Sequence, residues 1–216
     1  MNPQEIVNSP HIYMESFHKE DATGHDVAHV LRVVKMANYI AQQEQVGNLL
    51  TIQLASLLHD TVDAKLTDTS QAKHRLTQFL TQLQLPIQQQ EAILHIIEHM
   101  SYKNGENNDI SLSIEGQIVR DADRLDAIGA IGIARTFQYA GHFGEPMWIE
   151  GAYNDTLSNK EIDNKNVPAS AIKHFYEKLF KLKALMHTPT AKRLAQQRHE
   201  YMEVFVTQFF NEWYFK

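Results

Sequence analysis

Cysteine is absent from all 216 residues of the chain. This absence excludes a disulfide-stabilised scaffold and any metal site built from thiolates. No apolar run approaches the roughly 20 residues that a membrane-spanning helix needs, and the polar, amphipathic start of the chain does not resemble a signal peptide. We therefore expect a cytoplasmic protein that makes no use of a membrane.

The chain also lacks an excess of basic residues, because 20 Lys and Arg stand against 26 Asp and Glu, a net charge of −6. A general nucleic-acid binder normally presents a basic face, so binding to extended nucleic acid is not expected. A small anionic substrate is compatible with this charge, since a bound metal and a few local Lys or Arg side chains reverse the field inside one cleft.

The alternation of polar and apolar residues that is typical of β-strands is nearly absent, whereas apolar residues recur at intervals of three and four. This periodicity predicts an all-α protein, and the length suits a single domain over residues 1–216. Helices are expected over about 3–20, 26–45, 48–60, 70–84, 87–100, 113–140, 170–187 and 190–212. Within 113–140, Gly129 and Gly132 would allow close helix packing or a bend. The periodicity does not determine the oligomeric state, and a homodimer is compatible with it.

Residues 141–168 show no clear period and are expected to form a long loop. Loops of this length in compact domains are usually functional or mobile. The aromatic side chains of Trp148 and Tyr153 could therefore close over a bound base, or they could simply pack against the rest of the protein.

Histidine and aspartate occur where the apolar faces of three expected helices would otherwise continue. His29 lies in GHDVAHVLRVV, the pair His59-Asp60 in LASLLHDTVDAK, and Asp123 in IVRDADRLDAIGAIG. Two neutral imidazoles and two carboxylates suit Mn²⁺, Fe²⁺, Co²⁺, Ni²⁺ or Zn²⁺ better than Mg²⁺, and we expect Mn²⁺ first. A metal held by such a group can activate water for attack on phosphorus.

Spacing alone does not choose every member of this site. Asp123 and Asp126 share a helix face while Asp121 lies nearly opposite Asp123, so more than one carboxylate of the third segment could be the ligand. His95 and His99 are four residues apart and could hold a second ion, although such a pair is more often structural. His25 precedes His29 by one turn and could equally be a polar residue at a helix start.

Polar side chains near these ligands could act on a phosphate substrate. Arg32 lies one turn past His29 and could hold a phosphate oxygen in a bidentate contact. Asp63 lies four residues after His59 and could exchange a proton with bound water or with the leaving group. The candidate substrate contacts are Arg32, Lys65, His99, Lys103 and Arg124, and the candidate catalytic residues are Asp63 and Asp60.

The order His, His-Asp, Asp resembles the HD-domain superfamily of metal-dependent phosphohydrolases. The phrases GHDVAHVLRV, LLHDTVDAK and IVRDADRLDAIGAIGIART, together with the C-terminal stretch, resemble the bacterial YedJ/YpgQ-like HD hydrolases from about residue 20 onward. The resemblance implies an HD-domain helical bundle with a core over about 20–140 and two extra C-terminal helices within 170–212. It also implies His29, His59, Asp60 and Asp123 as the metal ligands. Val62 stands where family members mostly carry a second acidic residue. This departure leaves the metal ligands intact, but it argues against a proton relay that uses two carboxylates.

The resemblance further implies a nucleotide phosphohydrolase. The specific expectation is a (deoxy)nucleoside triphosphate pyrophosphohydrolase, which cleaves between the α and β phosphates and releases pyrophosphate. A 5′-nucleotidase and a cyclic-nucleotide phosphodiesterase are the enzymatic alternatives. A regulator that binds a nucleotide without turnover, or a helical scaffold with scattered surface histidines, would be a different class of protein. The sequence favours an enzyme, because no ligand position is lost.

Overall fold

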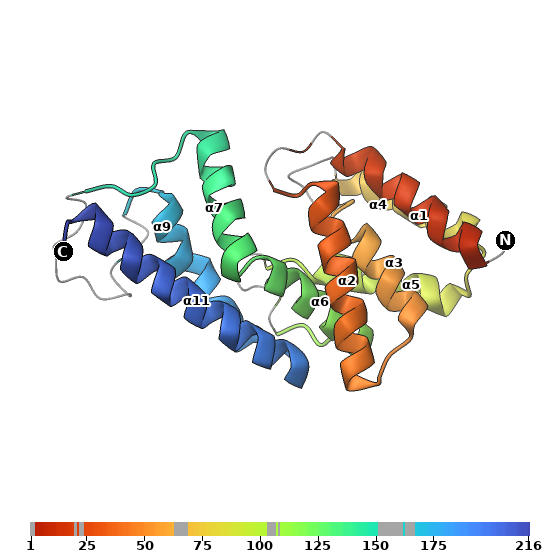
Figure 1. The fold of residues 1–216 in the computed structure, drawn as a ribbon. Helices are drawn as coiled ribbons and strands as arrows, with labels where there is room; N and C mark the ends of the chain where they lie inside the picture. Colours follow the sequence, from red (N-terminus) through yellow and green to blue (C-terminus); the bar gives the residue numbers. More distant parts are fainter. Residues whose placement is uncertain are drawn as a thin grey trace. The chain divides into compact units, whose positions relative to one another are not determined.

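The computed structural model describes residues 3–19, 21, 24–62, 69–102, 107, 109–150, 162 and 167–216. Every regular element in these ranges is helical (Figure 1), so the predicted all-α class is confirmed. No helix in the described part of the chain is both long and apolar enough to cross a membrane. Asp63, Lys65 and Lys103, as well as most of the 141–168 segment, lie outside the described residues.

The helices group into two compact units. The first comprises Met1–Asp21 and His25–Asp123, and the second comprises Ala22–Gly24 and Arg124–Lys216. This grouping does not test the prediction of a single domain over 1–216, which stays a prediction.

Helix α3 is the central element of the first unit. It packs against α1, α2 and α5 (Figure 1), and seven of its ten residues are buried. Asn48 caps its start by accepting a hydrogen bond from the N–H of Thr51 at 3.0 Å. Because α3 packs against other helices on several sides, the residues directly after it, His59 and Asp60, lie in the interior of the unit. The helices of this unit are α1 (Pro3–His18), α2 (Val27–Glu44), α3 (Leu49–Leu58), α4 (Thr69–Gln82), α5 (Ile87–His99) and most of α6 (Ile114–Asp126).

Helix α2 begins at a hydrogen-bonded cap and turns one face to the core. The side chain of Asp26 accepts a hydrogen bond from the N–H of His29 at 2.8 Å, which satisfies one of the free donors at the helix start. Its buried residues, His29, Val30, Val33, Ala37, Ile40 and Ala41, recur at the helical spacing. His29 therefore occupies a position on the apolar face and points inward.

The helical stretch predicted over 113–140, in which Gly129 and Gly132 would allow close packing or a bend, is divided in the structure into α6 and α7 (Gly129–Phe143). Between them, Ile128 is extended at φ −126 and ψ 165, and Gly129 has a φ of +78. A side chain at Gly129 would be strained in this left-handed conformation and would meet the side chain of Arg198 at 2.9 Å. A turn at this point therefore depends on glycine.

Gly132 is a second position at which a side chain would not fit. A Cβ atom there would clash with the main-chain carbonyl of Ala127, which cannot move away as a flexible side chain could. We expect Gly132→Ala to lower the free energy of unfolding by about 1–3 kcal/mol. Gly141 lies in the same helix with nothing within 4 Å of its Cβ position, so Gly141→Ala should instead add about 0.5–1 kcal/mol. Urea unfolding of both variants checks this, and an equal effect of the two would contradict it.

The second unit is built around the long helix α11 (Pro189–Trp213). The helix expected over 170–187 is present as a continuous helical run that changes its winding, through α9 (Ala171–His174), a π turn (Phe175–Leu179), α10 (Phe180–Leu182) and a 3₁₀ turn (Lys183–Leu185). Trp148 is buried in this unit, where its Nε1 donates to the Tyr214 hydroxyl at 3.0 Å and its ring packs edge-on against Phe210. Packing is therefore the interpretation that the structure supports for Trp148, and Tyr153 lies outside the described residues.

Candidate metal centre

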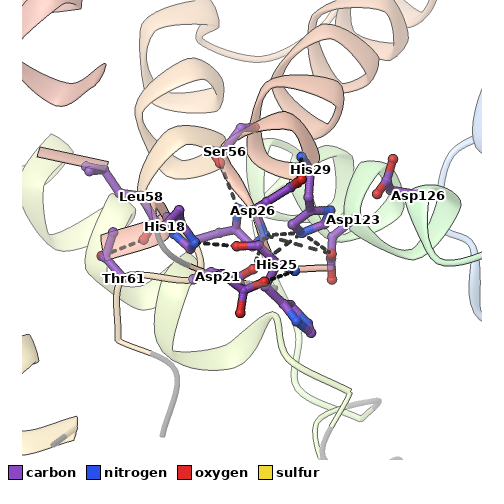
Figure 2. Close-up of polar contacts among 12 residues, drawn as sticks. His18, Asp21, His25, Asp26, His29, Ser56, Leu58, Thr61, Asp123 and Asp126 are labelled. Atoms are coloured by element: carbon purple, nitrogen blue, oxygen red, sulfur yellow. Dashed lines mark hydrogen bonds and ion pairs between the residues drawn. The ribbon is translucent and has the colours of Figure 1, made fainter. Parts of the chain in front are cut away.

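Four side chains from three separate segments of the first unit meet at one point. His29 comes from α2, His59 and Asp60 follow the end of α3, and Asp123 comes from α6. The Nε2 atoms of the two histidines lie 3.3 Å apart. Oδ2 of Asp60 lies 3.3 Å from Nε2 of His29 and 3.2 Å from Nε2 of His59. Oδ1 of Asp123 lies 3.7 and 3.8 Å from the same two nitrogens (Figure 2).

These separations fit a group of atoms that surrounds a single cation. Nitrogen and oxygen donors that each lie about 2.0–2.2 Å from one ion are about 2.8–3.6 Å apart when adjacent in octahedral or tetrahedral geometry, and only Asp123, at 3.7 and 3.8 Å from the two nitrogens, lies slightly beyond this range. The ligand atoms of His29, His59 and Asp123 all lie within 4.8 Å of one another and could hold a metal ion. Oδ2 of Asp60 lies against both imidazoles of this group, so a fourth donor is available.

The main chain fixes the orientation of the His59 ring. Its Nδ1 lies 2.8 Å from the carbonyl oxygen of Ser56. A carbonyl can only accept a hydrogen bond, so Nδ1 carries the proton and donates it. The neutral ring then turns the lone pair of Nε2 towards the cluster, which is the tautomer that a metal requires.

The carboxylates of the cluster raise the pKa of His59, and the histidines lower that of Asp60. Burial opposes a charge on His59, but the carboxylates of Asp60 and Asp123 outweigh it and raise the pKa of His59 to about 9. Burial likewise opposes a charge on Asp60, yet His59 and His29 hold its pKa well below the ordinary value. In the absence of a metal, the cluster therefore holds a proton on His59 at neutral pH.

The cluster is buried on the side of the histidines and more open on the side of the acids. The side chains of His29 and His59 are 1% exposed, whereas that of Asp60 is 14% and that of Asp123 29% exposed. Structural metal sites are closed, while catalytic sites keep a position open for water or substrate. The partial exposure of the two acids matches the second description better than the first.

Of the three acids of α6 among which spacing could not choose, Asp123 is the one beside the imidazoles. Asp121 is fully buried. Asp126 is also buried and forms an ion pair with Arg135 at 3.0 Å within the second unit.

Three of the predicted substrate contacts lie among the described residues. Arg32 is half-buried on α2, and His99 donates from Nδ1 to the carbonyl of His95 at 2.8 Å. Arg124 is buried in the second unit, where it donates to the carbonyl of Leu185 at 2.5 Å. The remaining candidates, Lys65 and Lys103, lie outside the described part, as does Asp63. The role of each in binding or catalysis stays a prediction.

The histidine pair of α5 does not join the cluster. Among the described residues, the group that could hold a metal contains neither His95 nor His99. The side chain of His95 is exposed, and its ring lies 4.5 Å from that of His99, measured between the centroids. The geometry gives no support to a second ion at this pair.

Two residues near the start of α2 hold the backbone there: the sequence predicted Asp21 only as a possible cap of this helix, and it gave no role to His18. Oδ2 of Asp21 accepts a hydrogen bond from the N–H of His25 at 2.7 Å, and Nδ1 of His18 donates to the carbonyl of the same residue at 2.6 Å. His18 is the last residue of α1 and is 1% exposed. Only its place at a helix end, shortly before the first histidine segment, could have drawn attention to it.

Comparison with known proteins gives relatives along nearly the whole chain. The family described as HD domain matches residues 27–128. Bacillus subtilis YpgQ is 38% identical over 200 residues, which cover 91% of this chain and 88% of YpgQ.

Solved structures agree with this match. A Lactobacillus plantarum protein superposes with a TM-score of 0.82 at 39% identity, covering 100% of both chains. An HD-superfamily hydrolase from Bacillus thuringiensis gives 0.75 at 38% identity, covering 99% of both. The crystal structure of Bacillus subtilis YpgQ in complex with ADP gives 0.74 at 35% identity, covering 98% of this chain and 97% of that one.

Proposed function

This chain belongs to the HD-domain family, and on that premise we propose that it is a metal-dependent nucleotide phosphohydrolase with His29, His59, Asp60 and Asp123 as the metal ligands. The observation that carries the proposal is the meeting of two imidazoles and two carboxylates, with donor atoms 3.2 to 3.8 Å apart, at the partly open end of a buried cluster. Neutral nitrogen and anionic oxygen donors suit a divalent transition metal, with Mn²⁺ as the first ion to test.

A divalent metal in such a site lowers the pKa of a bound water and stabilises the charge that develops on phosphoryl oxygens. The residues of the chain have separate tasks around it. The Ser56 carbonyl holds His59 in the tautomer that leaves Nε2 free, and the two carboxylates offset the charge of a divalent ion. Asp63 is the proposed proton acceptor for the attacking water, and the proposed phosphate contacts are Arg32, Lys65, His99, Lys103 and Arg124.

A nucleotide is the proposed class of substrate. Its support is the crystal structure of Bacillus subtilis YpgQ in complex with ADP, since YpgQ is 38% identical to this chain. The specific reaction that we propose is attack of water on the α phosphorus of a nucleoside triphosphate. The bond from that phosphorus to the bridging oxygen breaks, which releases a nucleoside monophosphate and pyrophosphate.

The test is a product analysis with metal-stripped protein and added Mn²⁺. Nucleoside and deoxynucleoside triphosphates, monophosphates and cyclic nucleotides are incubated separately and the products are resolved by chromatography. We expect a monophosphate and pyrophosphate in equal amounts from triphosphates, and loss of both products in Asp60→Asn. Phosphate released from monophosphates alone would replace the proposal by a nucleotidase. An absence of turnover in a protein that binds the metal would replace it by a binding role.

A further inference from the structure

The histidine at the end of α1 is buried and bonded to the main chain at the start of α2. His18 is 1% exposed, and its Nδ1 lies 2.6 Å from the carbonyl oxygen of His25. Since the carbonyl cannot donate, Nδ1 carries the proton of this hydrogen bond. The contact joins two helices at the point where the chain turns towards the metal ligand His29.

The peptide groups around His25 are held on both sides. Its N–H donates to Oδ2 of Asp21 at 2.7 Å, while its carbonyl accepts from His18 (Figure 2). The next residue, Asp26, accepts a hydrogen bond from the N–H of His29 at 2.8 Å. Three side chains therefore fix the backbone over the four residues that lead into the ligand, and the ring of His25 packs edge-on against that of His29 at 5.7 Å.

The chemistry of an imidazole suits this position beside a cation site. Burial lowers the pKa of His18, and although its bond to His25 and the charge of Asp60 oppose the shift, His59 and His29 add to it. The ring is therefore neutral at neutral pH and donates a hydrogen bond without bringing a further positive charge towards a metal. A lysine could make the same bond, but its charge would repel the ion.

The second nitrogen of His18 argues against a role in packing alone. Its Nε2 is buried and has no hydrogen-bond partner among the described residues. A buried polar atom without a partner lowers the stability of the fold, and an apolar side chain at this helix end would avoid that loss. Residues that break a local rule in this way are expected at functional sites.

We propose that His18 is a positioning residue of the metal centre, which fixes the backbone that presents His29 by holding the carbonyl of His25. The inference rests on the proposed function only in so far as His29 binds a metal. It adds to the four ligands an outer residue that acts through the main chain. Outer partners of metal ligands typically change metal affinity by about 10–100-fold when they are removed.

The test uses Co²⁺ alone, with the full-length protein, and measures affinity by competition with a chelator and coordination by visible absorption. His18→Phe keeps an aromatic ring but loses the donor, and we expect Co²⁺ affinity to fall by about 10–100-fold with a changed spectrum. In His18→Asn the amide N–H stands where Nδ1–H stood, and we expect affinity within a few-fold of the original. Unchanged affinity in His18→Phe overturns the proposal, and so does a failure of His18→Asn to restore it.

A matched control separates positioning from a general loss of stability. Gln90 is also buried in the first unit and donates to a main-chain carbonyl, that of Leu85, at 2.8 Å. We expect Gln90→Met to lower the free energy of unfolding while Co²⁺ affinity and spectrum stay unchanged, and an equal loss of affinity in Gln90→Met and His18→Phe would overturn the proposal. Because no nucleotide is present, a failure to find phosphohydrolase activity leaves this result standing. An unmodified protein that binds no Co²⁺ overturns both proposals.

Discussion

Replacing His59 by alanine is expected to remove the metal from the purified protein and to lower nucleotide turnover with it. Nε2 of this residue lies within 3.8 Å of a donor atom of each of the three other proposed ligands, so its loss opens the centre of the cluster. Loss of an outer partner of a ligand already lowers affinity by about 10–100-fold, and loss of a ligand itself should exceed that. The measurement is elemental analysis of metal content per chain, together with the product assay.

His95→Ala is the control for this experiment. It also removes a histidine from the first unit, but this side chain is exposed and lies outside the group that could hold a metal. We expect its metal content to equal that of the unmodified protein. Full metal content in His59→Ala would show that the proposed site is wrong, and a loss in His95→Ala would revive the second ion at α5.

The sequence predicted some parts of this metal site and could not predict others. Helical periodicity predicts the ends of α2 and α3, and so the surroundings of His29 and His59, to within about two residues, because α2 has one buried face and α3 is mostly buried. Periodicity could not choose among Asp121, Asp123 and Asp126 of α6, since the choice depends on where two other helices lie. The resemblance to a family made that choice, and the geometry places Asp123 beside the imidazoles.

The main-chain partners of two buried arginines could not be predicted from the sequence. Arg124 is one of the predicted substrate contacts, and Arg120 lies in the same acid-rich motif. The structure bonds Arg120 to the carbonyl of His99 at 2.6 Å and Arg124 to that of Leu185 at 2.5 Å. Main-chain carbonyls carry no sequence signal, so these contacts could not be foreseen. At Gly129 the sequence allowed a bend but did not predict the end of a helix, because a glycine inside a periodic stretch looks the same whether the helix bends or ends.

The affinity of the metal-free protein for a divalent ion is expected to rise about tenfold per pH unit between pH 6 and 8. The pKa of His59 is raised to about 9 by its acidic neighbours, so at neutral pH a metal must displace a proton from Nε2. Below the folded pKa, each unit of pH lowers the fraction of deprotonated ring about tenfold. Competition with a chelator of known protonation, repeated across the range, measures this slope.

The stability of the metal-free protein should change with pH in the opposite sense. Because the folded pKa of His59 lies above the value near 6.5 of an unfolded chain, its contribution is complete below about pH 6.5 and is lost as pH rises towards 9. Urea unfolding of stripped protein should therefore show falling stability over the range in which metal binding strengthens. Proton release on metal addition, measured by calorimetry in two buffers of different ionisation enthalpy, is the independent check. An affinity that stays flat from pH 6 to 8 without proton release would mean that His59 is already neutral, and that the acids beside it do not act on its charge as the geometry requires.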